Sequence, residues 1–255
     1  MEGVLHITWN RPESNNALDA STIEMMVTTL EEASTDDSIR ALVLTGSGSN
    51  FCSGADWVAT NTNAGPRPRT GSIQRRTPLQ AHRLIELLTE VQLPVVCAVR
   101  GWAAGLGFQI ALAADFTVAS ETARFWEPFI ERGFSPDSGA TWLLPRLVGV
   151  ARARELLMLG RKISGREAAE WGLILSAVPE ADLDVAVGQL VSRLAAGPTV
   201  ALGLTKRCIQ RGLESGLVHS MESEAGALEL SSRSKDFKEG LAAFRERRQP
   251  NFEGQ

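Results

Sequence analysis

The chain has 255 residues, of which 44% are hydrophobic and 22% are charged, and its formal net charge is −4. This composition is typical of a soluble globular protein of one domain, or of one domain with an appendage, and the negative balance argues against a basic surface for nucleic acid or for an anionic membrane. We therefore expect a small-molecule ligand, no nucleic-acid partner and no membrane partner.

The three cysteines, Cys52, Cys97 and Cys208, lie far apart without a C-x-x-C spacing, and an odd number cannot all pair within one chain. A reducing, cytoplasmic compartment is the expectation. The amino terminus lacks a positively charged start followed by an apolar run, and no stretch approaches the roughly 20 apolar residues that a spanning helix needs. We expect neither secretion nor membrane insertion.

The first elements are a short strand and a helix. Apolar residues from Val4 to Trp9 predict a strand that ends before Pro12, since proline cannot donate to a strand ladder. The following segment predicts a helix start with Asp19 or Ser21 as N-cap, and Ser21 with Glu24 fits a capping box.

Two continuous apolar runs, at 41–45 and 94–99, are typical of strands buried on both faces of a parallel sheet. A helix is predicted between them, from Leu79 to Val91. Because strands alternate with helices, the fold class is α/β.

Residues 61–77 are rich in Gly, Pro, Asn and Arg and lack periodicity, which predicts a mobile loop that can cover a site. From about Pro198 the sequence reads as successive amphipathic helices. We therefore predict a core over 1–197 and a helical region over 198–255.

Two glycine-rich turns each follow a predicted buried strand. The first holds Ser53, Gly54 and Asp56, and the second holds Gly105 and Gly107. At the carboxyl ends of parallel strands, such turns aim backbone N–H groups at a ligand oxyanion. Taken singly, each turn is equally explained as a tight strand-to-helix connection.

Together with flanking motifs, the turns resemble the crotonase superfamily of enoyl-CoA hydratases and isomerases. The resemblance runs in order along the whole chain and rests on Asn10-Arg11-Pro12 with Asn16-Ala17-Leu18, on 51–56, on 101–115, on 144–149, on 236–240 and on 247–252. It implies a spiral of ββα units with a helical carboxyl-terminal trimerisation region. It also implies an acyl-CoA substrate, with coenzyme A as part of that substrate and no separate cofactor, and a homotrimer or a dimer of trimers.

The resemblance places the thioester oxygen between the backbone N–H groups of Ala55 and Leu106 and the Ser53 carbonyl near the adenine ring. Most relatives have glycine at the position of Leu106, so the leucine side chain should narrow the pocket or turn away from it. One well-placed donor is worth ~3 kcal/mol to a developing oxyanion.

The two glutamates that flank water in the hydratases correspond to Gln109 and Phe129. An amide transfers no proton at neutral pH and a phenyl ring neither accepts nor donates one, so the usual two-glutamate hydration is not available. Glu127 and Glu131 are out of register with those positions. We interpret both as surface carboxylates or as groups behind the site.

Asp137 matches the single acid of the isomerase branches of the resemblance. An alternative role is that of N-cap for the helix that holds Trp142, because Pro-Asp-Ser often precedes a helix. With Phe129, Phe134 and Trp142 nearby, burial would raise the pKa of Asp137 and suit it to take up and return a proton.

Other charged and titratable residues admit two interpretations. His82 is either a packing residue at a helix boundary or, by resemblance to aroyl-CoA dehalogenases, a base beside a nucleophilic Asp137. Lys206 and Arg207, with arginines 67, 69, 75 and 76, are either a solvated charge run or contacts for the coenzyme A phosphates. No cluster has metal-ligand spacing, so no metal is predicted.

The resulting hypothesis is an enoyl-CoA isomerase of this family that shifts a double bond from β,γ to α,β. Its catalytic residues are Asp137, Ala55, Leu106 and Gln109. The alternatives are hydration by atypical residues, hydrolysis or dehalogenation with Asp137 as nucleophile, and an idle acyl-CoA-binding protein. The predicted substrate-binding residues are Ser53, Gly54, Asp56, His82, Gly105, Gly107, Phe129 and Trp142.

Overall fold

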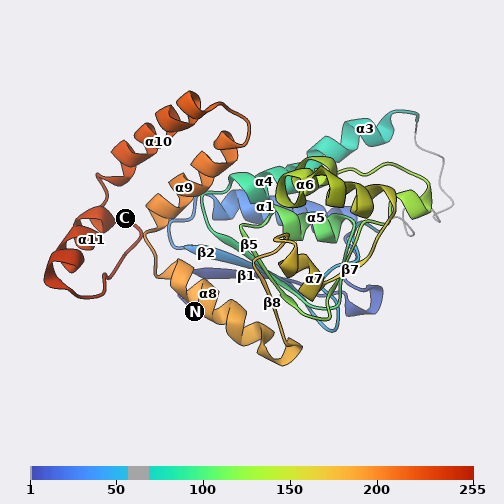
Figure 1. Ribbon diagram of the computed structural model, residues 1–255, viewed down its shortest axis with the longest axis horizontal. Coiled ribbons are helices and arrows are strands. Elements are labelled where there is room, and N and C mark those ends of the chain that lie inside the picture. Colours follow the sequence, from blue (N-terminus) through green and yellow to red (C-terminus); the bar gives the residue numbers. More distant parts are fainter. Residues whose placement is uncertain (1, 57–68) are drawn as a thin grey trace.

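The computed structural model describes residues 2–56 and 69–255, which form an α/β fold (Figure 1). The strands are β1 Val4–Trp9, β2 Ala41–Gly46, β3 Val95–Val99, β4 Trp102–Ala104, β5 Phe116–Ser120, β6 Arg124–Trp126, β7 Ile163–Ser164 and β8 Ser176–Val178. The helices are α1 Ala20–Ala33, α3 Ser72–Arg76, α4 Ala81–Glu90, α5 Leu106–Ala113, α6 Ala140–Met158, α7 Gly165–Glu170, α8 Leu183–Ala195, α9 Thr199–Gly212, α10 Leu217–Ser231 and α11 Lys235–Glu246.

Two sheets organise the core. The larger is parallel throughout, in the order β1-β2-β3-β5-β8, and the smaller has the order β4-β6-β7, with β4 parallel to β6 and β7 antiparallel. The strands predicted at 41–45 and 94–99 are confirmed as β2 and β3. The second glycine turn follows β4 rather than β3 directly, because the three-residue strand β4 lies between them.

Both faces of the larger sheet are covered by helices. Successive side chains of a strand point to opposite faces, so a continuous apolar run implies that both faces are buried. Leu42 and Leu44 belong to the apolar cluster under α1 and α4, whereas Val43 belongs to a second cluster on the opposite face. Leu183 and Val187 of α8 close that second cluster, and Figure 1 shows α8 alone beneath the sheet. The sequence run is therefore apolar at every position because no face meets water.

The start of α1 decides between the two predicted caps. The Asp19 carboxylate accepts hydrogen bonds from the Thr22 N–H and the Thr22 and Ser21 hydroxyls, at 2.7 to 2.8 Å. These hydrogen bonds lower the pKa of Asp19 to about 2. Asp19 is the N-cap, and Ser21 turns to it instead of forming a capping box with Glu24.

The predicted loop over 61–77 is corrected in its second half. Residues 57–68 lie outside the described residues, but Ser72–Arg76 form helix α3 and Thr77–Leu79 form a turn of 3-10 helix. A helix of one turn is too short to show an apolar period, so α3 could not be recognised from its pattern of residues.

The last three helices extend past the edge of the larger sheet (Figure 1). Lys206 fastens α9 to the core: its ammonium donates to the Leu88 carbonyl at 2.8 Å, to the Leu93 carbonyl at 3.3 Å and to the Asp115 carboxylate at 2.8 Å. Both interpretations of Lys206 as a surface charge are therefore wrong, because its side chain is only 7% exposed. The division of the chain at residue 198 stays a prediction.

No single helix in the described part of the chain is long and apolar enough to cross a membrane. Glu180–Ala195 and Thr199–Gly212 meet the length and composition only as a pair, across a bend of 104°.

Candidate active site

The two glycine turns lie against each other. Cys52 pairs with Ala103 of β4, through hydrogen bonds from the Cys52 N–H to the Trp102 carbonyl and from the Ala104 N–H to the Cys52 carbonyl, both 2.9 Å. A second isolated pairing, between Leu18 and Ala55, joins the first turn to the segment before α1. The backbone, not side chains, fixes the position of this turn.

Close packing between the turns requires glycine at two positions. A Cβ at Gly54, whose φ is +91°, would lie 2.6 Å from the Ala104 carbonyl oxygen and 3.2 Å from the Leu106 nitrogen. A Cβ at Gly107 would lie 2.4 Å from the Cys52 carbonyl oxygen. Any side chain at either position would push the two turns apart.

The turns present two unused backbone donors. The Gly54 carbonyl and the Asp56 N–H both pair with Leu18, at 2.8 and 2.9 Å, so the intervening Ala55 N–H points the other way. Leu106 is the first residue of α5, where a helix N–H has no carbonyl four residues back. Within residues 2–56 and 69–255 neither N–H has a hydrogen-bond partner. The pair has the character of the predicted oxyanion hole, whose role stays a prediction.

The Leu106 side chain is 4% exposed and belongs to the main apolar cluster. Its backbone is helical, so leucine presents the same N–H as glycine would at this position. The N-cap before it, Gly105, donates its own N–H to the Trp126 carbonyl at 2.9 Å and accepts from the Gln109 N–H at 3.0 Å.

Gln109 is fully buried one turn into α5 and faces Glu127. Its side-chain Nε2 donates to Glu127 Oε2 at 3.5 Å, the long limit of a hydrogen bond. Gln109 Oε1 and Glu127 Oε1 are also buried, and neither has a partner among the residues described.

Of the two interpretations of Glu127, the surface carboxylate is wrong, because its side chain is 1% exposed, and the place behind the site remains. It follows β6 directly, at the edge where β4 leads into Gly105, so the parallel pairing of β4 and β6 brings it beside α5. Burial and the negative charge of Asp137 raise the pKa of Glu127 well above its ordinary range, and the Gln109 hydrogen bond offsets this only in part. Glu131 is exposed, as expected, with its carboxylate 3.8 Å from the Lys162 ammonium.

Asp137 stands on the turn before α6, and its side chain does not cap that helix. The N-cap is Gly139, without a side-chain cap. Ser138 between them has a φ of +48°, in the left-handed region that favours glycine, at a cost of order 1 kcal/mol. The capping interpretation of Asp137 is therefore wrong.

Partial burial raises the pKa of Asp137, while the Ser138 hydroxyl and the nearby His82 lower it to a smaller extent. The aromatic surroundings predicted from the sequence are present in part. Phe129 is 4% exposed and packs edge-to-face on Phe134, with ring centroids 5.3 Å apart. Asp137 thus combines partial access with a carboxyl group poised to take up a proton.

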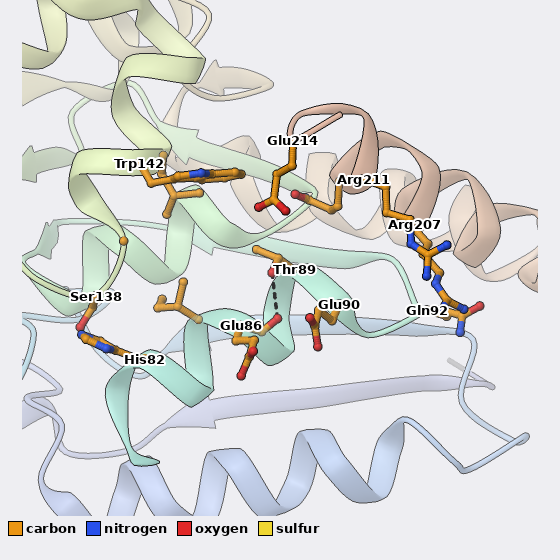
Figure 2. Close-up of a pocket in the computed structure, with 14 residues that line it drawn as sticks. His82, Glu86, Thr89, Glu90, Gln92, Ser138, Trp142, Arg207, Arg211 and Glu214 are labelled. Atoms are coloured by element: carbon orange, nitrogen blue, oxygen red, sulfur yellow. Dashed lines mark hydrogen bonds between the residues drawn. The ribbon is translucent and has the colours of Figure 1, made fainter. Parts of the chain in front are cut away.

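A cavity of about 840 Å³ opens beside this turn, between α4, α6 and α9. Figure 2 shows His82 and Ser138 at one end, Trp142 above, and Gln92 with Arg207 at the other end. At the end near Asp137, Ile85 and Leu143 lie beside Gly139 and add apolar surface next to His82 and Ser138, and the far end carries the charge of Arg207. Its volume fits a drug-sized or acyl ligand.

The remaining predicted residues lie around the first turn. Asp56 forms an ion pair with Arg11 at 3.8 Å, and Ser53 is half-buried with its N–H on the Asn15 carbonyl at 3.0 Å. In the described ranges, 2–56 and 69–255, no group of three or more His, Cys, Asp or Glu is arranged to hold a metal ion.

Sequence reasoning interpreted Glu127 as a surface carboxylate or a group behind the site, and it missed the contact of Glu127 with Gln109. A signal for it existed: β6 is followed by Glu127-Pro128, and a carboxylate at the end of a buried strand in a parallel pair falls at the ligand edge of the sheet. The strand itself has three residues, too few for recognition by periodicity.

The chain matches the enoyl-CoA hydratase/isomerase family over residues 1–255. It is 38% identical to 1,2-epoxyphenylacetyl-CoA isomerase of Escherichia coli, with 99% of this chain and 96% of that protein covered. It is 34% identical to 4-chlorobenzoyl coenzyme A dehalogenase-2 of an Arthrobacter species, with 96% and 88% covered. The crystal structure of an enoyl-CoA hydratase from Bacillus anthracis superposes with a TM-score of 0.93 at 31% identity, covering 100% of this chain and 97% of that one. The fold, the paired turns and this likeness along the whole chain agree: the protein is a member of the enoyl-CoA hydratase/isomerase, or crotonase, family.

Proposed function

We propose that the protein is an acyl-CoA isomerase that moves a double bond from the β,γ to the α,β position, without a separate cofactor. The observation that carries the proposal is the placement of Asp137, whose neighbours Ser138 and Gly139 line the cavity. Gln109 and Phe129 supply no proton where hydratases have glutamates, and Glu127 is buried behind Gln109.

In this mechanism the Ala55 and Leu106 N–H groups receive the thioester oxygen. Asp137 takes a proton from the α carbon, and the electron pair of that C–H bond forms an enolate whose charge rests on the oxygen between the two donors. Return of a proton to the γ carbon completes the shift. The raised pKa of Asp137 suits both steps, because a carboxylate of higher pKa is the stronger base.

The direct test is to incubate the protein with a 3-enoyl-CoA and a 2-enoyl-CoA separately and to identify the products. The proposal expects conjugated 2-enoyl-CoA from the first and no 3-hydroxyacyl-CoA from the second. Efficient hydration of the 2-enoyl-CoA would assign the protein to the hydratases instead.

Leu106 allows a test of the oxyanion hole by removal of one N–H. Proline is tolerated at the first position of a helix, so Leu106→Pro removes the donor with little change to α5. We expect kcat to fall by a factor of about 10² to 10³. Leu106→Ala is the matched control, since it removes the same side chain and keeps the N–H; an equal loss in both variants would refute the role of the donor.

A second candidate function is nucleophilic attack by Asp137 with His82 as base, and the coupling between these two residues favours it. A relative 34% identical to this chain is a 4-chlorobenzoyl coenzyme A dehalogenase. This chemistry predicts a covalent aryl ester on Asp137 during turnover of a 4-halobenzoyl-CoA, detectable by mass spectrometry. The ester should accumulate in His82→Ala, because the base is needed for water to hydrolyse it.

We also propose a homotrimer, or a dimer of trimers, assembled through the helical carboxyl-terminal region. Helix α10 has no buried residue, and large apolar side chains on α10 and α11 are exposed, including Leu217 at 74%, Leu228 at 66% and Phe244 at 85%. Exposed apolar surface of this kind is typical of subunit contacts. Light scattering should give three or six times the chain mass, and Leu228→Lys with Phe244→Lys should reduce it; a monomeric wild type would contradict this.

A further inference from the structure

The buried carboxyl group of Glu127 has no cation beside it. Its side chain is 1% exposed, and no ion pair joins it to the described part of the chain. Its polar contact is the 3.5 Å hydrogen bond from Gln109, and its Oε1 is unpartnered. An uncompensated buried carboxylate is costly, whereas the neutral acid is not, so the environment favours the protonated form.

The charge that does reach Glu127 is that of another carboxyl group. The negative charge of Asp137, on the turn before α6, raises the pKa of Glu127 further. From α4, His82 acts on Asp137. Among the described residues, the groups that act on the pair are therefore Gln109, Ser138 and His82.

The two carboxyl groups differ in their access to the cavity. Ser138 and Gly139, next to Asp137, line it, while Glu127 lies behind with Gln109. Two coupled carboxyl groups with unequal surroundings lose their protons in separate steps, the more exposed one first. The order here is Asp137 before Glu127.

We propose that Asp137 and Glu127 form an acid pair that carries one proton, in which Glu127 is a positioning residue that holds this proton in its buried site and Asp137 stays ionised toward the ligand. This inference deepens the proposed isomerase and rests on it. It assigns a role to Glu127, which does not correspond to either of the two glutamates of the hydratases.

The proton balance follows from the pair. When the α C–H bond breaks, its electrons enter the dienolate and its proton neutralises Asp137, so that the pair briefly carries two protons. The γ carbon then takes one proton from Asp137 as the α,β double bond forms. One carboxylate and one carboxylic acid remain, as at the start, and Glu127 never places a second negative charge beside the developing oxyanion.

The pair predicts two limbs in the pH profile of kcat/KM. The acid limb reports protonation of Asp137, and the alkaline limb reports ionisation of Glu127, whose carboxylate would repel the enolate. Glu127→Gln, which cannot ionise, should abolish the alkaline limb, and Glu127→Asp should restore one. Glu131→Gln, an exposed glutamate on the same segment, is the control that should leave both limbs in place.

A titration that needs no turnover tests the same pair. Infrared spectra should show a protonated carboxyl band for Glu127, identified by its loss in Glu127→Gln and its retention in Glu131→Gln. Removal of the neighbouring negative charge in Asp137→Asn should lower the pH midpoint of this band by about one pH unit. Because Asp137→Asn leaves Glu127 in place, the comparison also holds if Glu127→Gln fails to fold.

The outcomes separate the inference from the function on which it rests. An equal midpoint in wild type and Asp137→Asn, or an alkaline limb unchanged by Glu127→Gln, overturns the acid pair alone. A wild-type protein that shifts no double bond overturns the proposed isomerase and the role of the pair in it. A lower midpoint in Asp137→Asn, together with loss of the alkaline limb in Glu127→Gln, supports both.

Discussion

Asp137→Asn should lower kcat for the double-bond shift by a factor of about 10² to 10⁴, with little change in KM. The amide has nearly the same size as the carboxyl group but accepts no proton, so the thioester still binds while the α proton stays in place. Steady-state rates of 2-enoyl-CoA formation from a 3-enoyl-CoA measure the effect directly.

Two controls make the Asp137 result specific. Glu131→Gln removes an exposed carboxylate from the same segment and should keep wild-type kcat. Thermal unfolding of Asp137→Asn should stay close to wild type, because the side chain of Asp137 does not cap α6. A variant that keeps more than a tenth of wild-type kcat would rule out Asp137 as the only base.

Lys206→Met should lower the free energy of unfolding by about 3 to 5 kcal/mol. The substitution leaves the Asp115 carboxylate without its cation and the Leu88 and Leu93 carbonyls without a donor. Asp115 still accepts from the Val95 N–H at 2.8 Å, which limits the loss but does not neutralise the charge. Urea unfolding followed by circular dichroism measures the change.

The matched control for Lys206 is Lys238→Met on the exposed part of α11, which should change stability by less than about 0.5 kcal/mol. The double variant Lys206→Met, Asp115→Asn should recover part of the loss, because it removes the stranded charge as well. Equal stability of Lys206→Met and wild type would show that the attraction between Lys206 and Asp115 only offsets the free-energy cost of burying their charges.

The elements that the sequence predicted correctly are those with long or continuous patterns. Strand β3 is apolar at every position and β2 from Ala41 to Leu44, because both faces are covered, and helix α4 is amphipathic over its whole length. The strands of the smaller sheet have only two or three residues, and α3 has five. These elements are too short to show the two-residue period of a strand or the period of about 3.6 residues of a helix. Short elements are placed by tertiary contacts, not by local pattern.

Two polar residues show the limit of single-sequence reasoning at the site. Lys206 is one cation in an amphipathic helix, and nothing in its neighbourhood in sequence distinguishes it from exposed Arg207. Glu127 is marked in the sequence only by its place after β6, because its partners Gln109 and Asp137 lie 18 and 10 positions away. Asp137 could be named as a candidate acid from the sequence because it matches a position of the family resemblance, and this match does not depend on its burial.

Deuterium incorporation during turnover tests the central claim most directly. A 3-enoyl-CoA is incubated with the protein in deuterated buffer, and the product is analysed by proton magnetic resonance. We predict conjugated 2-enoyl-CoA, formed by wild type and lost in Asp137→Asn, with deuterium at the γ carbon to the extent that the proton held by Asp137 exchanges with the buffer before it is returned. Recovery of unchanged 3-enoyl-CoA, or of a conjugated product with equal yield from Asp137→Asn, would contradict the assignment of Asp137 as the residue that moves the proton.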